Sequence, residues 1–206
     1  MTQIGEIALW VALVLSVWGA GAAFIGGRSL DFRQTNGRVE FSAPYQPEMN
    51  WSDMTLSCWL KVMSSGPQEV VSYSSSTGTG KFRLWFDGAA WVFDVAEGDT
   101  WRSARWTQRA SSRNQRWRHF AAIVDAKSRR IRLYVEGELK AEAEWNGPRL
   151  KAASAAHRLV IGASGDPAKR SGQPTWFRPF EGQIDEVMFF DSVVDPNRIR
   201  SMGVLR

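Results

Sequence analysis

The residues best suited to chemistry are three carboxylates in the segment "EGQIDEV": Glu181, Asp185 and Glu186. Glycoside hydrolysis needs two carboxyl groups that flank the scissile bond, about 5 to 5.5 Å apart in a retaining enzyme. In a regular strand Glu181 and Asp185 share one face, whereas Glu186 points to the other. The position between the first two is Gln183, so the shared face offers no third acid. The pattern therefore favours a chain that is not an enzyme.

Candidate metal ligands and nucleophiles are few. The two histidines, His119 and His157, lie in strand-like segments, and with Cys58 they make no zinc-binding spacing. Cys58 is the single cysteine, so no internal disulfide forms, and its apolar neighbours favour a small buried side chain. Candidate loop ligands for calcium are Asp99, Asp125 and Asp166. An isolated loop aspartate is more often a turn former, so we expect no metal and no cofactor.

The most basic part of the chain is "WRSARWTQRASSRNQRWRH", residues 101–119, which contains six arginines and no acidic residue. The candidate contact residues for an anionic partner are Trp101, Arg102, Arg105, Trp106, Arg109, Arg113 and Arg116. Such a surface suits lipid headgroups, where each basic residue contributes about 1 kcal/mol, or an acidic glycan or protein. Nucleic acid is not expected, because no nucleic-acid-binding fold signature accompanies the arginines. The alternative is a solvated loop whose charges keep the protein soluble.

Residues 7–25, "IALWVALVLSVWGAGAAFI", form an apolar run without a charge. As a helix these residues would span about 28 Å at 1.5 Å per residue, close to a hydrocarbon core of roughly 30 Å. The sequence therefore predicts a transmembrane anchor helix within residues 1–28, and a cell-membrane protein that crosses the bilayer once. A cleaved signal peptide is the alternative, because "AGA" at 20–22 fits a cleavage site, although the tail before the run has no Lys or Arg.

Two features of the expected anchor bear on its surroundings. Small residues recur along it at about one helical turn: Ser16, Gly19, Ala20 and Ala23. Such residues permit close packing against another membrane helix, although they are also simply common in membrane helices. Basic residues follow the run and none precedes it: Arg28, Arg33 and Arg38. By the positive-inside rule this bias places the rest of the chain in the cytoplasm.

Residues 29–206 read as a series of short strands. Leu30 and Phe32 alternate with polar residues, and Asn36-Gly37 is a strong hairpin signal. Further strand-like segments occupy 54–63, 68–76, 81–95 with a turn at Asp87-Gly88, 118–125, 130–145 with a turn at Glu136-Gly137, 157–164 and 180–191. Turns at this regular spacing predict an antiparallel sandwich or barrel. Asp195 followed by Pro196 predicts the start of one short helix near the C-terminus.

Four segments taken together, "WRHFAAIVD", "RRIRLYVEGEL", "LVIGAS" and "FEGQIDEVMFFDSVVDPNRI", resemble the laminin-G-like, concanavalin A-like jelly roll. The resemblance covers roughly residues 29–203 and implies an all-β fold of two curved antiparallel sheets in a domain of residues 29–206. Related glucanases carry an E-x-D-x-E strand, in which Gln183 here replaces the middle acid. The resemblance implies no single function, because the fold hosts lectins, adhesion modules, glycosidases and structural parts. Members commonly lie outside the cytoplasm, against the arginine bias.

These observations lead to one expected function and one main alternative. We expect a non-catalytic, membrane-anchored interaction or structural protein, an accessory subunit that stabilises a larger membrane complex through other membrane subunits and lipid headgroups. The alternative is a membrane-tethered lectin-like module that binds carbohydrate or glycoprotein, and a hydrolase is a third reading. The side of the membrane stays open, as does the question whether the 11 tryptophans are core or exposed.

Overall fold

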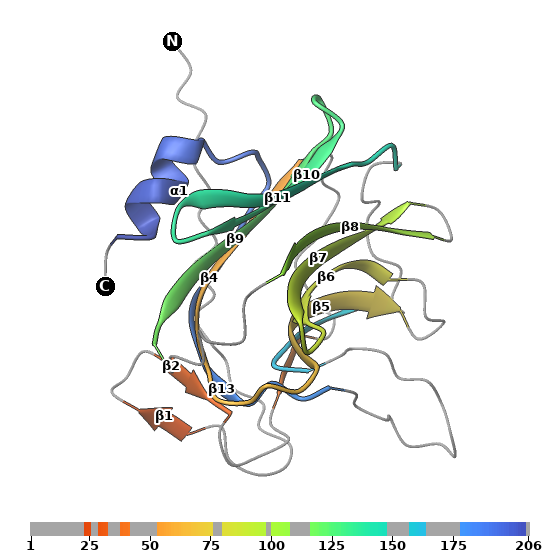
Figure 1. Ribbon diagram of the computed structural model, residues 1–206. Coiled ribbons are helices and arrows are strands. Elements are labelled where there is room, and N and C mark those ends of the chain that lie inside the picture. Colours follow the sequence, from red (N-terminus) through yellow and green to blue (C-terminus); the bar gives the residue numbers. More distant parts are fainter. Residues whose placement is uncertain are drawn as a thin grey trace.

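The computed structural model describes residues 23–25, 29–32, 38–41, 53–75, 80–97, 100–107, 116–147, 157–163 and 178–204. These residues form two antiparallel β-sheets that pack face to face, with one short helix on the outside (Figure 1). The predicted all-β, two-sheet antiparallel sandwich with a short C-terminal helix is therefore confirmed.

Within the described residues, the first sheet has seven strands in the order β1-β2-β13-β4-β9-β10-β11. Their bounds are Ala23–Ile25 (β1), Ser29–Asp31 (β2), Gly182–Phe190 (β13), Met54–Val62 (β4), Arg118–Asp125 (β9), Arg130–Val135 (β10) and Glu138–Glu144 (β11). In the same part of the chain the second sheet has six strands in the order β3-β12-β5-β6-β7-β8. Their bounds are Val39–Phe41 (β3), His157–Ile161 (β12), Gln68–Ser75 (β5), Gly80–Phe86 (β6), Ala90–Glu97 (β7) and Thr100–Thr107 (β8).

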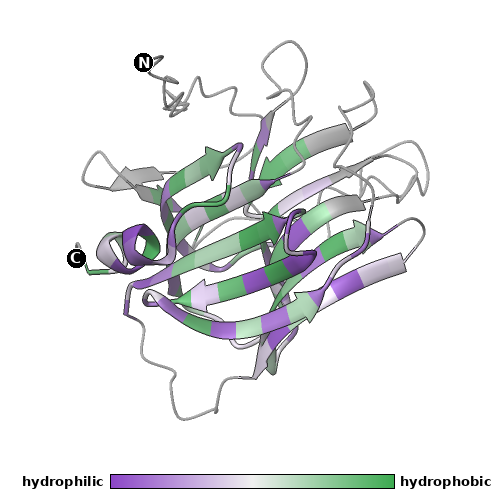
Figure 2. Ribbon diagram, turned by 90° about the horizontal axis from the view of Figure 1, so that it is seen from above, coloured by the Kyte–Doolittle hydropathy of each residue, from purple (hydrophilic) through white to green (hydrophobic). Residues whose placement is uncertain are grey.

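Apolar side chains that alternate along the strands fill the space between the sheets, and Figure 2 shows this alternation of polar and apolar positions. Trp91 of β7 and Phe120 of β9 join the two sheets, with ring centroids 4.5 Å apart. Cys58 is fully buried in this core, as predicted, and burial raises the pKa of its thiol. Trp145 is also buried, and its Nε1 donates to the carbonyl of Ala96, 3.0 Å away.

Helix α1, Pro196–Met202, covers part of the outer face of the seven-stranded sheet. It begins where the sequence predicts, because the carboxylate of Asp195 accepts a hydrogen bond from the backbone N–H of Asn197 at 2.8 Å. Ile199 is its buried anchor. The small cluster beneath the helix consists of Ala121, Ile123, Tyr134, Phe190, Val194 and Ile199.

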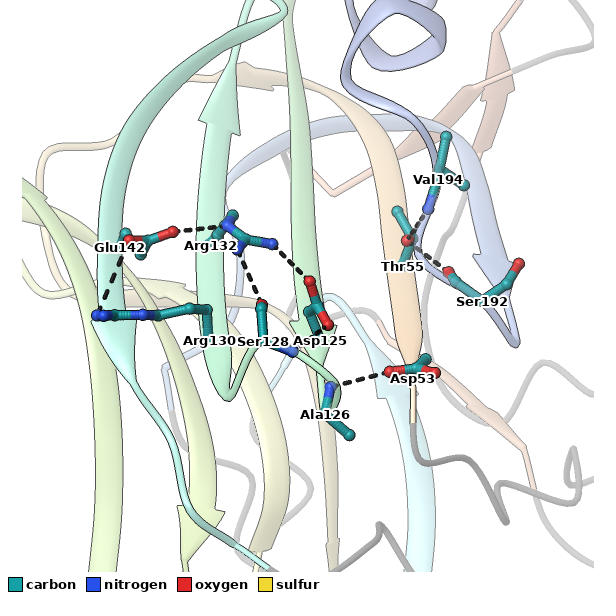
Figure 3. A network of polar contacts seen from close by, with 10 residues as sticks. All are labelled: Asp53, Thr55, Asp125, Ala126, Ser128, Arg130, Arg132, Glu142, Ser192 and Val194. Atoms are coloured by element: carbon teal, nitrogen blue, oxygen red, sulfur yellow. Dashed lines mark hydrogen bonds and ion pairs between the residues drawn. The ribbon is translucent and has the colours of Figure 1, made fainter.

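Polar contacts hold two connections at one end of the seven-stranded sheet, the β9–β10 turn and the segment after β13 (Figure 3). Arg132 on β10 donates to Glu142 on β11 at 2.6 Å and to Asp125 at the end of β9 at 2.9 Å. Thr55 on β4 donates to the carbonyl of Ser192 at 2.8 Å and accepts from the backbone N–H of Val194 at 3.0 Å. The network therefore fixes both the β9–β10 turn and the segment that leads from β13 into α1.

Two local expectations are wrong in this structure. The Asn36-Gly37 signal predicts a hairpin, yet β2 and β3 lie in different sheets: β2 pairs with β1 and β13, and β3 pairs with β12. Residues 33–37 themselves lie outside the described residues. The alternative of a solvated loop for the basic stretch is wrong for Thr100–Thr107, which forms strand β8 and pairs with β7 along its whole length. The role of this stretch as a contact surface stays a prediction.

Only the last residues of the expected N-terminal anchor lie within the described part of the chain. Its last residues, Ala23–Ile25, form β1 and not helix, because they pair with β2 at the edge of the seven-stranded sheet. Ser16, Gly19 and Ala20 lie outside the described residues, so their role as helix-packing residues stays a prediction. Among the residues that the structure describes, no helix has the length and apolar character needed to cross a bilayer.

Candidate functional site

The candidate site lies on the outer face of the six-stranded sheet, over β5 to β8. Phe93 and Ala104 point into the core, so the residues next to them in β7 and β8 point outward. The pairing register places Arg83 opposite Asp94, and Asp94 opposite Ser103, in one row across three strands. A neighbouring row is made by Glu69, Trp85, Val92 and Arg105.

Asp94 is the polar centre of this face and is only 2% exposed. Its Oδ2 accepts from Nε of Arg83 at 2.7 Å and from Nε1 of Trp85 at 2.9 Å. Its Oδ1 accepts from Oγ of Ser103 at 2.6 Å. A buried carboxylate is tolerated when it is both ion-paired and hydrogen-bonded, and Asp94 meets both conditions.

Two arginines and two tryptophans stack around this centre. The guanidinium carbon of Arg83 lies 4.6 Å from the ring centroid of Trp85 and 4.9 Å from that of Trp101. The guanidinium carbon of Arg178 lies 4.6 Å from the Trp85 ring as well. Both arginines share the carboxylate of Glu69, with N–O distances of 3.8 Å and 3.6 Å. We call the set Glu69, Arg83, Trp85, Asp94, Trp101, Ser103 and Arg178 the Arg83 cluster.

Trp101 is the accessible part of the Arg83 cluster. It is 36% exposed, and among the large apolar residues that the structure describes as exposed it is the aromatic one. Trp85, in contrast, is half-buried, and the guanidinium groups of Arg83 and Arg178 both lie over its ring. The face therefore offers one open aromatic ring beside a compact set of hydrogen-bonding groups.

Arg105 extends the cluster toward the β6–β7 turn, where it forms an ion pair with Asp87. Burial alone would raise the pKa of Asp87, but hydrogen bonds from the backbone N–H groups of Ala89 and Ala90 and from Arg105 outweigh it and lower that pKa. Asp87 is therefore a charged partner of Arg105 at neutral pH.

The sequence comparison now decides the family. A family model described as the concanavalin A-like lectin/glucanases superfamily, of laminin-G type, matches residues 18–200. The chain belongs to this superfamily. The resemblance found in the strand motifs is thereby confirmed. Comparison of the sequence with curated proteins gives no match.

Solved structures share the concanavalin A-like fold at low sequence identity. A heptameric SAP-like pentraxin from Limulus polyphemus has a TM-score of 0.63 at 14% identity, over 85% of this chain and 81% of its own. The CBM40 of an IT-sialidase from Ruminococcus gnavus, bound to α2,3 sialyllactose, has a TM-score of 0.61 at 15% identity, over 82% and 98%. The ligand-binding domain of botulinum neurotoxin serotype D, in complex with N-acetylneuraminic acid, has a TM-score of 0.63 at 11% identity, over 85% and 42%. At these identities the likeness shows the fold alone.

Within the concanavalin A-like sandwich, the candidate contact residues do not form one patch. Trp101 and Arg105 face outward in the site. Trp106 points the other way and packs against the core, with Nζ of Lys140 at 5.8 Å from its ring. Arg102 pairs with Glu97 at the end of the β7–β8 hairpin. Arg116 is exposed just before β9 in the other sheet, and Arg109 and Arg113 lie outside the described residues.

Sequence reasoning missed most of the Arg83 cluster. Arg83 and Trp85 alternate with Phe82, Leu84 and Phe86, so the pattern of β6 already marks them as outward-facing. Asp94 is marked in the same way on β7. No comparable signal exists for Arg178, because it follows a segment far along the chain and reaches Glu69 only through the fold.

The residues first considered for chemistry lie elsewhere. Glu181 and Glu186 are exposed, whereas Asp185 is buried on the other sheet and accepts from the backbone N–H of Glu186. His119 is fully buried and its Nε2 lies 2.8 Å from Oγ of Ser57. Burial lowers the pKa of His119 to about 4, so the ring is neutral at physiological pH. Asp125 is a turn former, since it accepts from the backbone N–H of Ser128 at 2.9 Å.

Within the described residues, no three His, Cys, Asp or Glu side chains come together as metal ligands. Asp99 and Asp166 lie outside that part of the chain, as does the side chain of His157. The Arg83 cluster has groups that can bind a ligand: an open aromatic ring, planar guanidinium groups and a serine hydroxyl on one surface.

Proposed function

We propose that the chain is a non-catalytic glycan-binding module that an N-terminal apolar segment holds at the cell membrane. The observation that carries the proposal is the position of Trp101, which is 36% exposed beside Arg83, Asp94 and Ser103 on the outer face of the six-stranded sheet. An apolar ring beside a few fixed polar groups is the usual make-up of a site that orients a small ligand.

Sugars suit this combination of groups. The axial C–H bonds of a pyranose ring make an apolar face that packs on an aromatic side chain, while its hydroxyls donate and accept at the rim. Ser103 is exposed and its Oγ already contacts Asp94, so a sugar hydroxyl that reaches it joins an existing hydrogen-bond chain. Two fold neighbours are described in complex with sialyllactose and with N-acetylneuraminic acid, which supports a glycan over other small molecules.

The ion pairs of the Arg83 cluster support a non-catalytic role. Glu69 and Asp94 are the carboxylates of the Arg83 cluster, and both have Arg83 within 4 Å. A glycosidase needs one carboxyl group that gives a proton to the leaving oxygen, whereas each carboxylate of this cluster is held in an ion pair with Arg83. The cluster is therefore built to hold charge in place and not to transfer protons.

The membrane part of the proposal rests on residues 7–22, which are apolar and precede β1 directly. Because glycans are concentrated outside the cytoplasm, the proposal places the sandwich on the outer side, against the bias of Arg28, Arg33 and Arg38. A reporter fused after residue 206 tests the side: activity of a periplasm-dependent reporter is expected, and activity only of a cytoplasmic reporter would contradict this placement.

The binding proposal is tested with the full chain in lipid nanodiscs, because detergents with sugar headgroups would compete for the site. Binding to a glycan array is measured for the native chain, for Trp101→Ala and for the control Leu139→Ala. Leu139 is 50% exposed on β11 of the other sheet, so it matches the loss of a large exposed side chain outside the site. We expect Trp101→Ala to lose at least tenfold in signal and Leu139→Ala to keep it. Equal loss in both variants, or no binding by the native chain, would overturn the proposal.

A further inference from the structure

Each arginine that the structure describes on the candidate face lies in an ion pair with a carboxylate there. Arg83 pairs with Asp94, Arg178 with Glu69, and Arg105 with Asp87. Three arginines thus meet three carboxylates, although the whole chain carries a formal net charge of +5. Among the described side chains of this site, the arginines and carboxylates are therefore equal in number.

We infer that the Arg83 cluster selects uncharged glycans over acidic ones. The inference rests on the proposed function and specifies its ligand class. It runs against the prediction from the sequence, in which the arginine-rich stretch indicates an anionic partner.

The first reason is that the guanidinium of Arg83 is already committed. Its Nε donates to Asp94 at 2.7 Å and its NH1 lies 3.8 Å from Glu69. Its guanidinium carbon also lies over the rings of Trp85 and Trp101. An incoming carboxylate or sulfate that takes the Arg83 guanidinium from Asp94 or Glu69 displaces that acid. The displaced acid would then be a buried charge without its partner, because Asp94 is 2% and Glu69 is 1% exposed.

The second reason is that the buried acids oppose an anion directly. Glu69 and Asp94 lie beneath the stacked arginines, so a negative ligand group that approaches the cluster meets two like charges at short range. A site with balanced charges also exerts no long-range attraction that would raise the encounter rate of a polyanion. Hydroxyl groups carry no such penalty, since they can accept from a guanidinium N–H and donate to a carboxylate without displacing either.

The test uses the full chain in nanodiscs of zwitterionic lipid on an array of paired glycans. Each pair shares one backbone and differs in charge, such as the methyl ester of sialyllactose with free sialyllactose and methyl-esterified with free oligogalacturonide. Binding is measured at 50 mM and 500 mM NaCl. We expect signal from neutral members, at least fivefold above their acidic partners, and less than a twofold change with salt.

The outcomes separate the inference from the proposed function. Stronger binding of acidic members that weakens at high salt would overturn the inference and leave the glycan-binding proposal standing. Absence of binding to every glycan would overturn both. Equal binding within pairs at both salt concentrations would also overturn the inference, because the site would then not select by charge.

Two variants test whether the carboxylates that face the arginines cause the selection of uncharged glycans. Asp94→Asn keeps one oxygen that can accept from Nε1 of Trp85, and its amide N–H can donate to Oγ of Ser103. The variant removes the negative charge that faces Arg83, so acidic glycans are expected to gain at least fivefold relative to neutral ones, with salt-sensitive binding. Asp87→Asn frees Arg105 nearer the surface and keeps the oxygen that caps Ala89 and Ala90, so it serves if the first variant fails to fold. Unchanged preference in a folded variant would contradict the inference.

Discussion

Asp94 and Arg83 face each other directly across β7 and β6, with 2.7 Å between Oδ2 of Asp94 and Nε of Arg83. The pair joins the hydrogen-bond network of the sheet to the aromatic surface above it. Because Asp94 is only 2% exposed, the pair is part of the fold as well as part of the site. Its contribution to stability can be separated from its contribution to binding.

Replacing Arg83 by leucine is expected to lower the free energy of unfolding by about 2 kcal/mol. Removing one partner of a wholly buried pair costs roughly 3–5 kcal/mol, and the 26% exposure of the Arg83 side chain reduces this figure. The control is Arg130→Leu, whose partner Glu142 lies 3.9 Å away in a pair that is 43% and 34% exposed. An exposed pair contributes about 0–1 kcal/mol. Urea unfolding measures both, and equal losses would contradict the role given to Asp94.

Acid is expected to destabilise the domain through His119. Its pKa is about 4 in the folded chain, below the usual value near 6.5 of an unfolded histidine. The unfolded state therefore binds more protons between these values, and the free energy of unfolding falls as the pH falls. Between pH 7.5 and pH 5.0 the expected loss from this residue is about 2 kcal/mol.

The variant His119→Gln isolates that effect from the titration of carboxylates. A glutamine can keep the contact to Oγ of Ser57 but carries no proton-dependent charge. Urea unfolding of both proteins at the two pH values is expected to show a smaller pH-dependent loss in the variant. A parallel decrease in both would exclude His119 as the source.

Gly137 is expected to be required for the docking of α1. Its φ is +75°, and a Cβ at this position would lie 2.6 Å from Cα of Arg200 in the helix. Gly137→Ala should therefore cost about 1–2 kcal/mol for the backbone conformation alone, with a further loss as the helix moves. Gly66→Ala is the matched control, because its nearest neighbour would be Oγ of Ser64 at 3.7 Å. Thermal unfolding should show a lower Tm only for the first variant.

Thr55 is expected to stabilise the connection between β13 and α1 through its hydroxyl group. It is fully buried and contacts the backbone of Ser192 and Val194 (Figure 3). Thr55→Val keeps the shape and leaves two backbone groups without that partner, which should cost about 1–3 kcal/mol. Thr107→Val, at an exposed position of β8, should change the free energy of unfolding by less than about 0.5 kcal/mol. Chemical unfolding compares the two, and a neutral Thr55→Val would contradict this role.

Local signals in the sequence were sufficient for much of the fold. The β6–β7 hairpin with its turn at Asp87-Gly88, the β10–β11 hairpin with Glu136-Gly137 and the N-cap of α1 each depend on a few adjacent residues. Glu136 and Gly137 both adopt positive φ, as a two-residue hairpin turn requires. The placement of β2 and β3 was not predictable in this way, because their partners β13 and β12 lie more than a hundred residues away.

The candidate site depends on pairing across strands, which the composition of the sequence does not show. Arg102 and Arg105 look like free positive charge in the sequence, yet the register brings Glu97 and Asp87 to them. Trp101 and Trp106 look equivalent, but strand alternation sends one outward and the other to the core.

An accessory role in a membrane complex stays a prediction, which blue-native electrophoresis of nanodisc or mild-detergent samples would address.

The edge strand β1 has a mechanical consequence. It is joined to β2 by three residue pairs, from Ala23 with Asp31 to Ile25 with Ser29. Tension that reaches the sandwich from residue 22 pulls at the open end of this ladder, so the pairs separate one after another and not all at once. We therefore expect β1 to detach from β2 at low force, before the force acts on the pairing of β13 with β4 further inside the sheet.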